Sequence, residues 1–134
     1  MISSYNNTSQ EVAINGLLTF TTDRILTGCT ATRNGQTFQL NKPGYYYVTF
    51  NTTFTTEATG EATVELQNNG LVVPGATGTE TVTTAGDSNS ISFATIVRVL
   101  PSCNVIDNTA RLTFVATGIA LNATVANVNI TKLC

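Results

Sequence analysis

The sequence predicts an all-β protein that folds as an antiparallel sandwich or barrel. Short stretches in which apolar and polar residues alternate recur along the chain, and a period of two is typical of strands with one buried face. No stretch keeps the helical period of about 3.6 residues for the length that a helix needs. Turn-forming residues separate the alternating stretches at short intervals, which favours antiparallel neighbours over parallel strands joined by helices.

The predicted strands are rich in Val, Ile, Thr, Phe and Tyr, the residues that fit a pleated and half-buried surface. Most of them are bounded by Gly, Pro, Asn or Asp, which favour turns. In chain order the predicted strands cover residues 11–14, 17–21, 24–27, 36–40, 45–56, 61–68, 71–74, 79–84, 90–100, 109–117 and 123–132.

Three Asn-Gly pairs predict two-residue hairpin turns, because both central positions of a type I′ turn need a positive φ. These pairs are Asn15-Gly16, Asn34-Gly35 and Asn69-Gly70. Other strands are predicted to end at Lys42-Pro43-Gly44, Pro74-Gly75, Ala85-Gly86-Asp87 and Pro101-Ser102. The chain shows no linker, internal repeat or low-complexity tail, so we expect residues 1–134 to form a single domain.

The composition predicts a surface that is poor in charge. Charged residues make up 10% of the chain, compared with about a quarter in ordinary soluble domains. Such a surface must rely on Thr, Asn and Ser, or be covered by other subunits. The net charge is −2 and the six cations are scattered, without the basic stripe that nucleic-acid binding needs. We therefore expect no nucleic-acid partner.

The segment "NKPGYYYVTFNTTF", residues 41–54, carries no charged residue after Lys42. As a strand it places apolar side chains on one face, namely Tyr46, Val48, Phe50 and Phe54. The opposite face carries Tyr45, Tyr47, Thr49, Asn51 and Thr53. A solvent-facing row normally carries Lys, Glu or Arg, so this second face is predicted to lie in a two-sided core or at a subunit interface. The strands at 90–100 and 123–132 are equally low in charge on both faces.

The residues that usually carry catalysis are largely missing. The chain has no His, which removes the commonest general base and the commonest metal ligand. Glu61 and Glu65 share one strand face and could imitate an inverting glycosidase pair, but an exposed polar rim is the preferred interpretation. Oxygens at 87–89 and 107–108 could bind calcium, and Asx turns explain both stretches as well. We predict no catalytic, cofactor-binding or metal-binding residues.

The chain is predicted to be made in the cytoplasm and to involve no membrane. No apolar run approaches the ~20 residues that span a bilayer, and the first residues lack the pattern of a signal peptide. Cys29, Cys103 and Cys134 leave one thiol unpaired in any intramolecular scheme. Three reduced thiols are the preferred state, and one disulfide with one free thiol is the alternative.

The segment "LNKPGYYYVTFNTTF" resembles the Pro-Gly-x-Tyr-x-(Val/Phe) strand of the tumour necrosis factor and complement-q superfamily of trimeric jelly rolls, through Pro43, Gly44 and Tyr46. Within it, the chain is similar to the C-terminal domain of the collagen-like glycoprotein on Bacillus spore surfaces. There a similar strand precedes stretches like "ATVELQNNGLVVPGATGT" and "SISFATIVRVL". The chain also resembles short proteins of this type that decorate the virions of tailed phages. The resemblance runs from about residue 36 to the end, and the Gly-x-y stretch of the spore protein is missing.

The resemblance implies an antiparallel jelly-roll sandwich that assembles as a homotrimer. In the superfamily the strand after Pro-Gly has one side in the core and the other at the threefold axis. This would place Tyr45, Tyr47, Thr49 and Asn51 at the trimer interface.

The function implied is that of a non-enzymatic structural protein on the virion surface, as a phage capsid decoration protein or head-fibre knob. A spore or cell-surface structural glycoprotein domain and a carbohydrate-binding module are the alternatives. The expected partners are other copies of the chain, a major capsid protein or a host-surface glycan.

Overall fold

The computed structural model describes residues 1–26, 31–99 and 110–133. In these ranges the chain forms strands and no helix, so no helix there could span a membrane. The strands are β1 (Ile2–Asn6), β2 (Gln10–Val12), β3 (Thr22–Leu26), β4 (Ala31–Asn34), β5 (Thr37–Leu40), β6 (Gly44–Thr55), β7 (Gly60–Asn68), β8 (Leu71–Val82), β9 (Asn89–Val99), β10 (Ala110–Thr117) and β11 (Leu121–Lys132). Cys29, Cys103 and Cys134 lie outside the described residues, and so do the predicted turn at Pro101-Ser102 and the Asp107-Asn108 pair.

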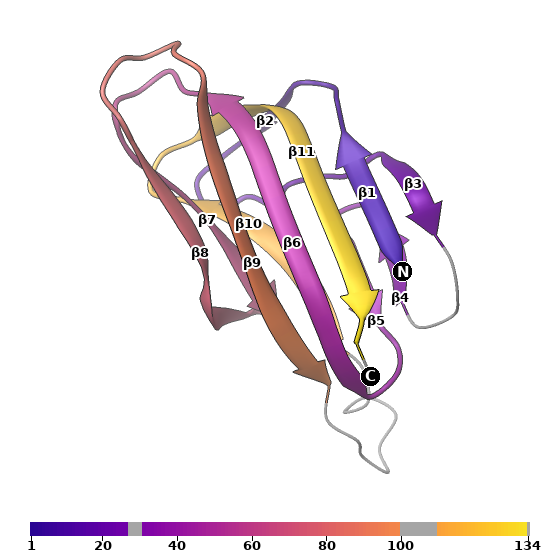
Figure 1. The fold of residues 1–134 in the computed structure, drawn as a ribbon. Coiled ribbons are helices and arrows are strands. Elements are labelled where there is room, and N and C mark those ends of the chain that lie inside the picture. The colour runs from indigo at the N-terminus through magenta and orange to yellow at the C-terminus, as the bar shows by residue number, and fades with distance from the viewer. Residues whose placement is uncertain (27–30, 100–109, 134) are drawn as a thin grey trace.

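The strands form two antiparallel sheets that pack face to face as a sandwich (Figure 1). Sheet A has the order β3-β1-β11-β6-β9, and β2 also pairs with β11. Sheet B has the order β4-β5-β10-β7-β8. Several neighbouring strands are far apart in the sequence, as for β1 beside β11 and β6 beside β9. This all-β arrangement of two sheets with long connections is a jelly roll.

Aromatic side chains from both sheets meet in the core. The rings of Phe50 on β6 and Phe114 on β10 stack with centroids 4.7 Å apart, so they join sheet A to sheet B. Phe20 and Phe38 meet edge to face at 5.2 Å and both contact Phe114. Such ring pairs stabilise a core by more than their buried area alone.

Most predicted strands are confirmed to within one or two residues, and the differences have physical causes. β1 was not predicted because the sequence "ISSYN" does not alternate. Its Ser3 and Ser4 are buried, and the Ser4 hydroxyl donates to Asp23 at 2.5 Å. β4 was not predicted either. The strand predicted at 17–21 is wrong, since this segment makes only one isolated bridge, Leu17 to Val115, although Leu18 and Phe20 are buried in the core.

The two strands predicted at 71–74 and 79–84 form one strand, β8, with a large bulge. Leu71 and Val72 pair with Asn68 and Gln67, and pairing with β7 resumes at Thr77 opposite Glu65. Pro74 has no N–H to give to the ladder, and Gly75 has a φ of 82°. The Pro-Gly pair therefore interrupts the pairing without ending the strand.

The three Asn-Gly pairs have different outcomes. Asn69 and Gly70 have φ values of 53° and 86° and join β7 to β8, so this hairpin turn is confirmed. At Asn34-Gly35 the turn falls one residue later than predicted, at residues 35–36, because Asn34 still pairs with Thr37. Asn15 also has a positive φ, but its turn follows β2 of sheet A and leads to the Leu17 bridge on sheet B, so the predicted hairpin is wrong there.

Substitution of Gly118 should destabilise the fold more than the same change at Gly86. Both glycines have a positive φ, 86° and 87°, which costs an alanine about 1 kcal/mol. A Cβ at Gly118 would also overlap the carbonyl oxygen of Glu61, whereas a Cβ at Gly86 meets nothing. We expect Gly118→Ala to lose about 3 kcal/mol of unfolding free energy and Gly86→Ala about 1 kcal/mol, as measured by urea denaturation. Equal losses would show that the turn at Gly118 can open.

An ion pair joins the two sheets at one edge and should make stability depend on pH. Asp23 on β3 accepts from the Nε of Arg33 on β4 at 2.5 Å. The hydrogen bond from Arg33, followed by that from Ser4, holds the pKa of Asp23 below its ordinary value of 3.8, although burial opposes them. A lowered folded-state pKa stabilises the protein above the ordinary pKa, and this stabilisation is lost as the pH falls through the folded-state value.

Asp23→Asn should therefore cost stability at neutral pH and should lose less stability than the wild type when the pH falls below 3.8. Urea denaturation at several pH values measures the difference between the two proteins. Parallel curves for the two proteins would contradict a role for this carboxylate.

Candidate functional site

The outward side of sheet A carries the side chains that the sequence assigned to an interface. β6 lies between β11 and β9 (Figure 1). Its residues alternate between buried and outward positions as predicted. Tyr46, Val48, Phe50 and Phe54 are buried in the core. Tyr45 and Tyr47 point outward and are 42% and 43% exposed. Large aromatic side chains with this exposure contribute apolar area that a partner could cover.

The strand register extends this outward row into a surface, which we call the outer face of sheet A. Its members are Tyr45, Tyr47, Thr49, Asn51 and Thr53 of β6; Arg98, Ile96, Ala94, Ser92 and Ser90 of β9; and Thr131, Asn129, Asn127 and Val125 of β11. Ile96, which is 55% exposed, is the neighbour of Tyr47 on β9, and Thr131 is its neighbour on β11. The only charged residue among these members is Arg98.

The cations that do reach this side of sheet A lie on aromatic rings. The guanidinium of Arg98 is 5.4 Å from the ring centroid of Tyr45, and that of Arg24 is 5.0 Å from that of Tyr5. Guanidinium groups stack on aromatic rings more readily than ammonium groups and are more weakly hydrated. Two of the cations on this side of sheet A are therefore held against aromatic rings.

Tyr46 lies between the two outward tyrosines in the sequence, but its side chain belongs to the core. Its side chain is 1% exposed, and its hydroxyl donates to the carbonyl oxygen of Lys42 at 2.6 Å. Burial raises the pKa of this phenol. Tyr45, Tyr46 and Tyr47 thus differ sharply in environment although they are adjacent in the sequence.

Two of the outward asparagines are incompletely hydrogen-bonded. Within the described ranges, the buried side-chain oxygens of Asn68, Asn122 and Asn127 have no hydrogen-bond partner. Asn127 belongs to the outer face, and Asn122 lies further along β11, opposite Thr55 of β6. Buried polar atoms usually have a partner, so the oxygens of these two amides are available to water or to another molecule.

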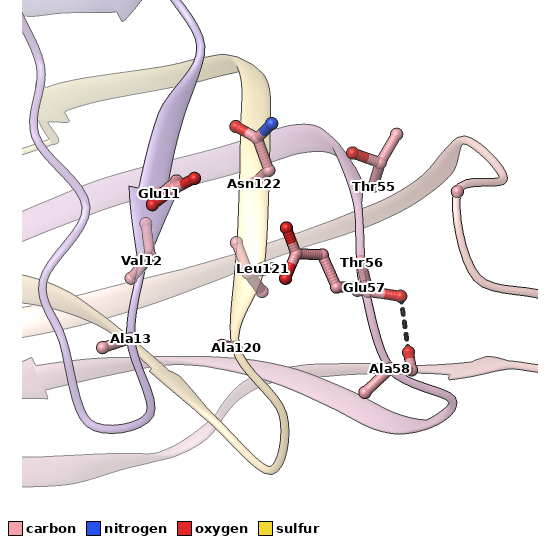
Figure 2. Close-up of a pocket in the computed structure, with 11 residues that line it drawn as sticks. Glu11, Val12, Ala13, Thr55, Thr56, Glu57, Ala58, Ala120, Leu121 and Asn122 are labelled. Atoms are coloured by element: carbon pink, nitrogen blue, oxygen red, sulfur yellow. Dashed lines mark hydrogen bonds between the residues drawn. The ribbon is translucent and has the colours of Figure 1, made fainter.

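A pocket of about 630 Å³ opens at one end of sheet A, where β2, the start of β11 and the end of β6 meet (Figure 2). Its polar groups come mainly from Glu11, Glu57 and Asn122, and Val12 and Leu121 contribute apolar surface. The hydroxyl of Thr56 donates to the carbonyl oxygen of Ala58 at 2.8 Å and is already engaged (Figure 2).

Among the acidic residues singled out in the sequence, those within the described ranges are not assembled into a site. Glu61 and Glu65 lie on the outward side of β7, and Glu65 accepts from Gln67 at 3.0 Å. Neither lines the pocket of Figure 2. Asn89 donates to the carbonyl oxygen of Asp87 at 3.2 Å. In the described parts of the chain, no three His, Cys, Asp or Glu side chains gather to hold a metal ion.

Sequence reasoning missed two parts of this surface. The pocket draws Glu11, Glu57 and Asn122 from three segments that are distant in the chain, and no local motif signals it. Tyr5 of β1 lies beside the outer face, because β1 pairs with β11 and places Tyr5 opposite Asn127. The pairing of β1 could not be expected while its sequence gave no strand signal.

Comparison with known proteins identifies the fold. No protein-family model and no curated protein sequence matches this chain. Murine APRIL has a similar structure with a TM-score of 0.71, at 10% identity over 98% of each chain. The globular domain of zebrafish complement 1qA matches with a TM-score of 0.66, at 14% identity over 95% of this chain and 92% of that one. The vertex protein P5 of PRD1 matches with a TM-score of 0.60, at 16% identity over 99% and 96%.

The fold and the outer face together define a structural class. The chain is an all-β, antiparallel jelly-roll sandwich with one low-charge sheet face. More particularly, it has the jelly-roll fold of the tumour necrosis factor and complement-q type, which confirms the expectation from the Pro43-Gly44-x-Tyr46 strand.

Proposed function

We propose that three copies of this chain bring their outer faces of sheet A together around a threefold axis. The observation that carries the proposal is the outer face itself, with exposed Tyr45 and Tyr47 beside Ile96 and almost no charge. Thr49 and Asn51 continue the same row. Burial of this face in an assembly accounts for a chain that has only 10% charged residues.

The trimer serves as a non-enzymatic structural protein on a virion surface, as a capsid decoration protein or the knob of a head fibre. The likeness to the PRD1 vertex protein supports this role, and so does the resemblance of the sequence to phage decoration proteins. Capsids offer positions of local threefold symmetry, so a trimer can attach with matching symmetry and three weak contacts add up. Residues 1–134 act in this role as one domain, with a major capsid protein as the further partner.

A carbohydrate-binding module is the second candidate, because Tyr45 and Tyr47 are exposed aromatic rings two residues apart on one strand face. The apolar face of a sugar ring can stack on an aromatic ring of this kind. This candidate needs the two tyrosines to be free, whereas the trimer covers them. The oligomeric state therefore separates the two proposals before any ligand is tested.

Immunogold labelling tests the virion role directly. Antibodies against the purified protein are applied to particles and cells from a culture that expresses the gene at its natural level. We expect gold on the heads or head fibres of released particles. Gold confined to spores or cell walls would favour the spore or cell-surface alternative and would overturn the virion role without touching the trimer.

A further inference from the structure

We infer that Asn51 and Asn127 form a hydrogen-bonded layer between copies of this chain, and that this layer fixes how the copies pair. The inference rests on the trimer proposed above and names the residues that determine its register. The two residues lie directly opposite each other on β6 and β11, in the middle of the outer face of sheet A.

The amides of Asn51 and Asn127 are unused within the chain. In the part of the protein that the structure describes, neither side chain makes a hydrogen bond, and the Oδ1 of Asn127 is buried. The next pair on the same face differs, because Asn129 donates to the hydroxyl of Thr49 at 3.2 Å. The Asn51–Asn127 pair therefore differs from the Asn129–Thr49 pair beside it, whose side chains already bond each other.

A neighbouring copy can supply what these amides lack. Each amide offers both a donor and an acceptor, and a half-turn about χ2 exchanges the two groups. In a cyclic trimer, Asn127 of one copy can bond Asn51 of the next, and the same contact closes after three steps. The contact is heterologous, so both residues are needed at every interface.

The rows directly beside this layer offer no second free pair of amides. One row holds Thr49 and Asn129, which already bond each other, and the other holds Thr53 and Val125, which is 40% exposed. A shift of one copy by one row would bring the amides against these side chains and lose the bonds between amides. A buried polar layer of this kind penalises wrong registers, as a single buried Asn does in coiled coils.

The test uses the full chain and four variants: Asn51→Leu, Asn127→Leu, the double variant, and Asn68→Leu as a control. Asn68 also has a buried oxygen without a partner, but it lies on β7 of sheet B. Sedimentation of fluorescently labelled protein over a dilution series gives the concentration at which each trimer is half dissociated. Circular dichroism of the same samples checks that the chain stays folded.

We expect each single substitution on the outer face to raise the half-dissociation concentration about tenfold or more, because it leaves the neighbour's amide unpaired at every interface. The double variant should lie closer to the wild type than either single variant, since no amide is then left without a partner. Asn68→Leu should not change the half-dissociation concentration. The same set made with Ala replaces the Leu variants if any of those fail to fold.

Single variants that dissociate like the wild type would overturn the inference while the proposed trimer stands. A double variant that is as weak as the two single effects multiplied together would overturn the pairing of Asn51 with Asn127. A wild-type protein that is a monomer throughout the dilution series would instead overturn the proposed trimer, and the layer with it.

Discussion

Replacement of Tyr46 with lysine should leave no soluble folded protein. The Tyr46 side chain is 1% exposed and lies among the core residues between the two sheets. A lysine there would bury an ammonium group without a partner, at a cost of several kcal/mol, which is comparable to the whole stability of a domain of this size. Expression followed by circular dichroism and a solubility assay measures the result.

Tyr46→Phe provides the matched control for this substitution. It keeps the ring in the core and removes only the hydrogen bond to the carbonyl oxygen of Lys42. We expect a folded protein that has lost about 1 kcal/mol of unfolding free energy. A soluble and folded Tyr46→Lys protein would show that this face of β6 is not part of the core.

Replacement of Tyr47 with lysine should give a folded chain that no longer forms a trimer. Tyr47 is adjacent to Tyr46 in the sequence but is 43% exposed on the outer face of sheet A, so the monomer can accept a charge there. In the proposed trimer the substitution places three ammonium groups near one axis, where they are desolvated and repel one another. The expected cost to assembly is several kcal/mol.

Thr81→Lys is the control for the added charge. Thr81 is exposed on β8 of sheet B, and a lysine there should leave the trimer intact. Circular dichroism and sedimentation velocity on both variants separate loss of fold from loss of assembly. A Tyr47→Lys protein that stays trimeric at the wild-type concentration would mean that this face does not meet other copies.

The sequence predicted the fold class and the two faces of β6 because these depend on local patterns. The alternation of Tyr46, Val48 and Phe50 with their outward neighbours is a property of one strand, and the structure confirms it. β1 was missed because its polar residues Ser3 and Ser4 are buried, and the Ser4 hydroxyl finds its partner, Asp23, on another strand. A pattern of burial that depends on distant hydrogen bonds leaves no periodic signal in the sequence.

Some residues of the candidate site could likewise be predicted from one strand, whereas others depend on how distant strands pair. Tyr45, Tyr47, Thr49 and Asn51 lie on one strand, so the period of two places them on a single face. The unpaired amide of Asn127 follows only from the register between β6 and β11, which are more than 60 residues apart along the chain. The bulge at Pro74 likewise depends on how β8 pairs with β7, and the Pro-Gly pair alone is typical of a strand end.

The outer face of sheet A is proposed to be an interface between copies of this chain. The most direct test is the mass of the unmodified protein by sedimentation equilibrium at micromolar concentration, without added metal. We expect a single species of about three times the chain mass of 14.2 kDa. A species of one chain mass under these conditions would contradict the proposed interface.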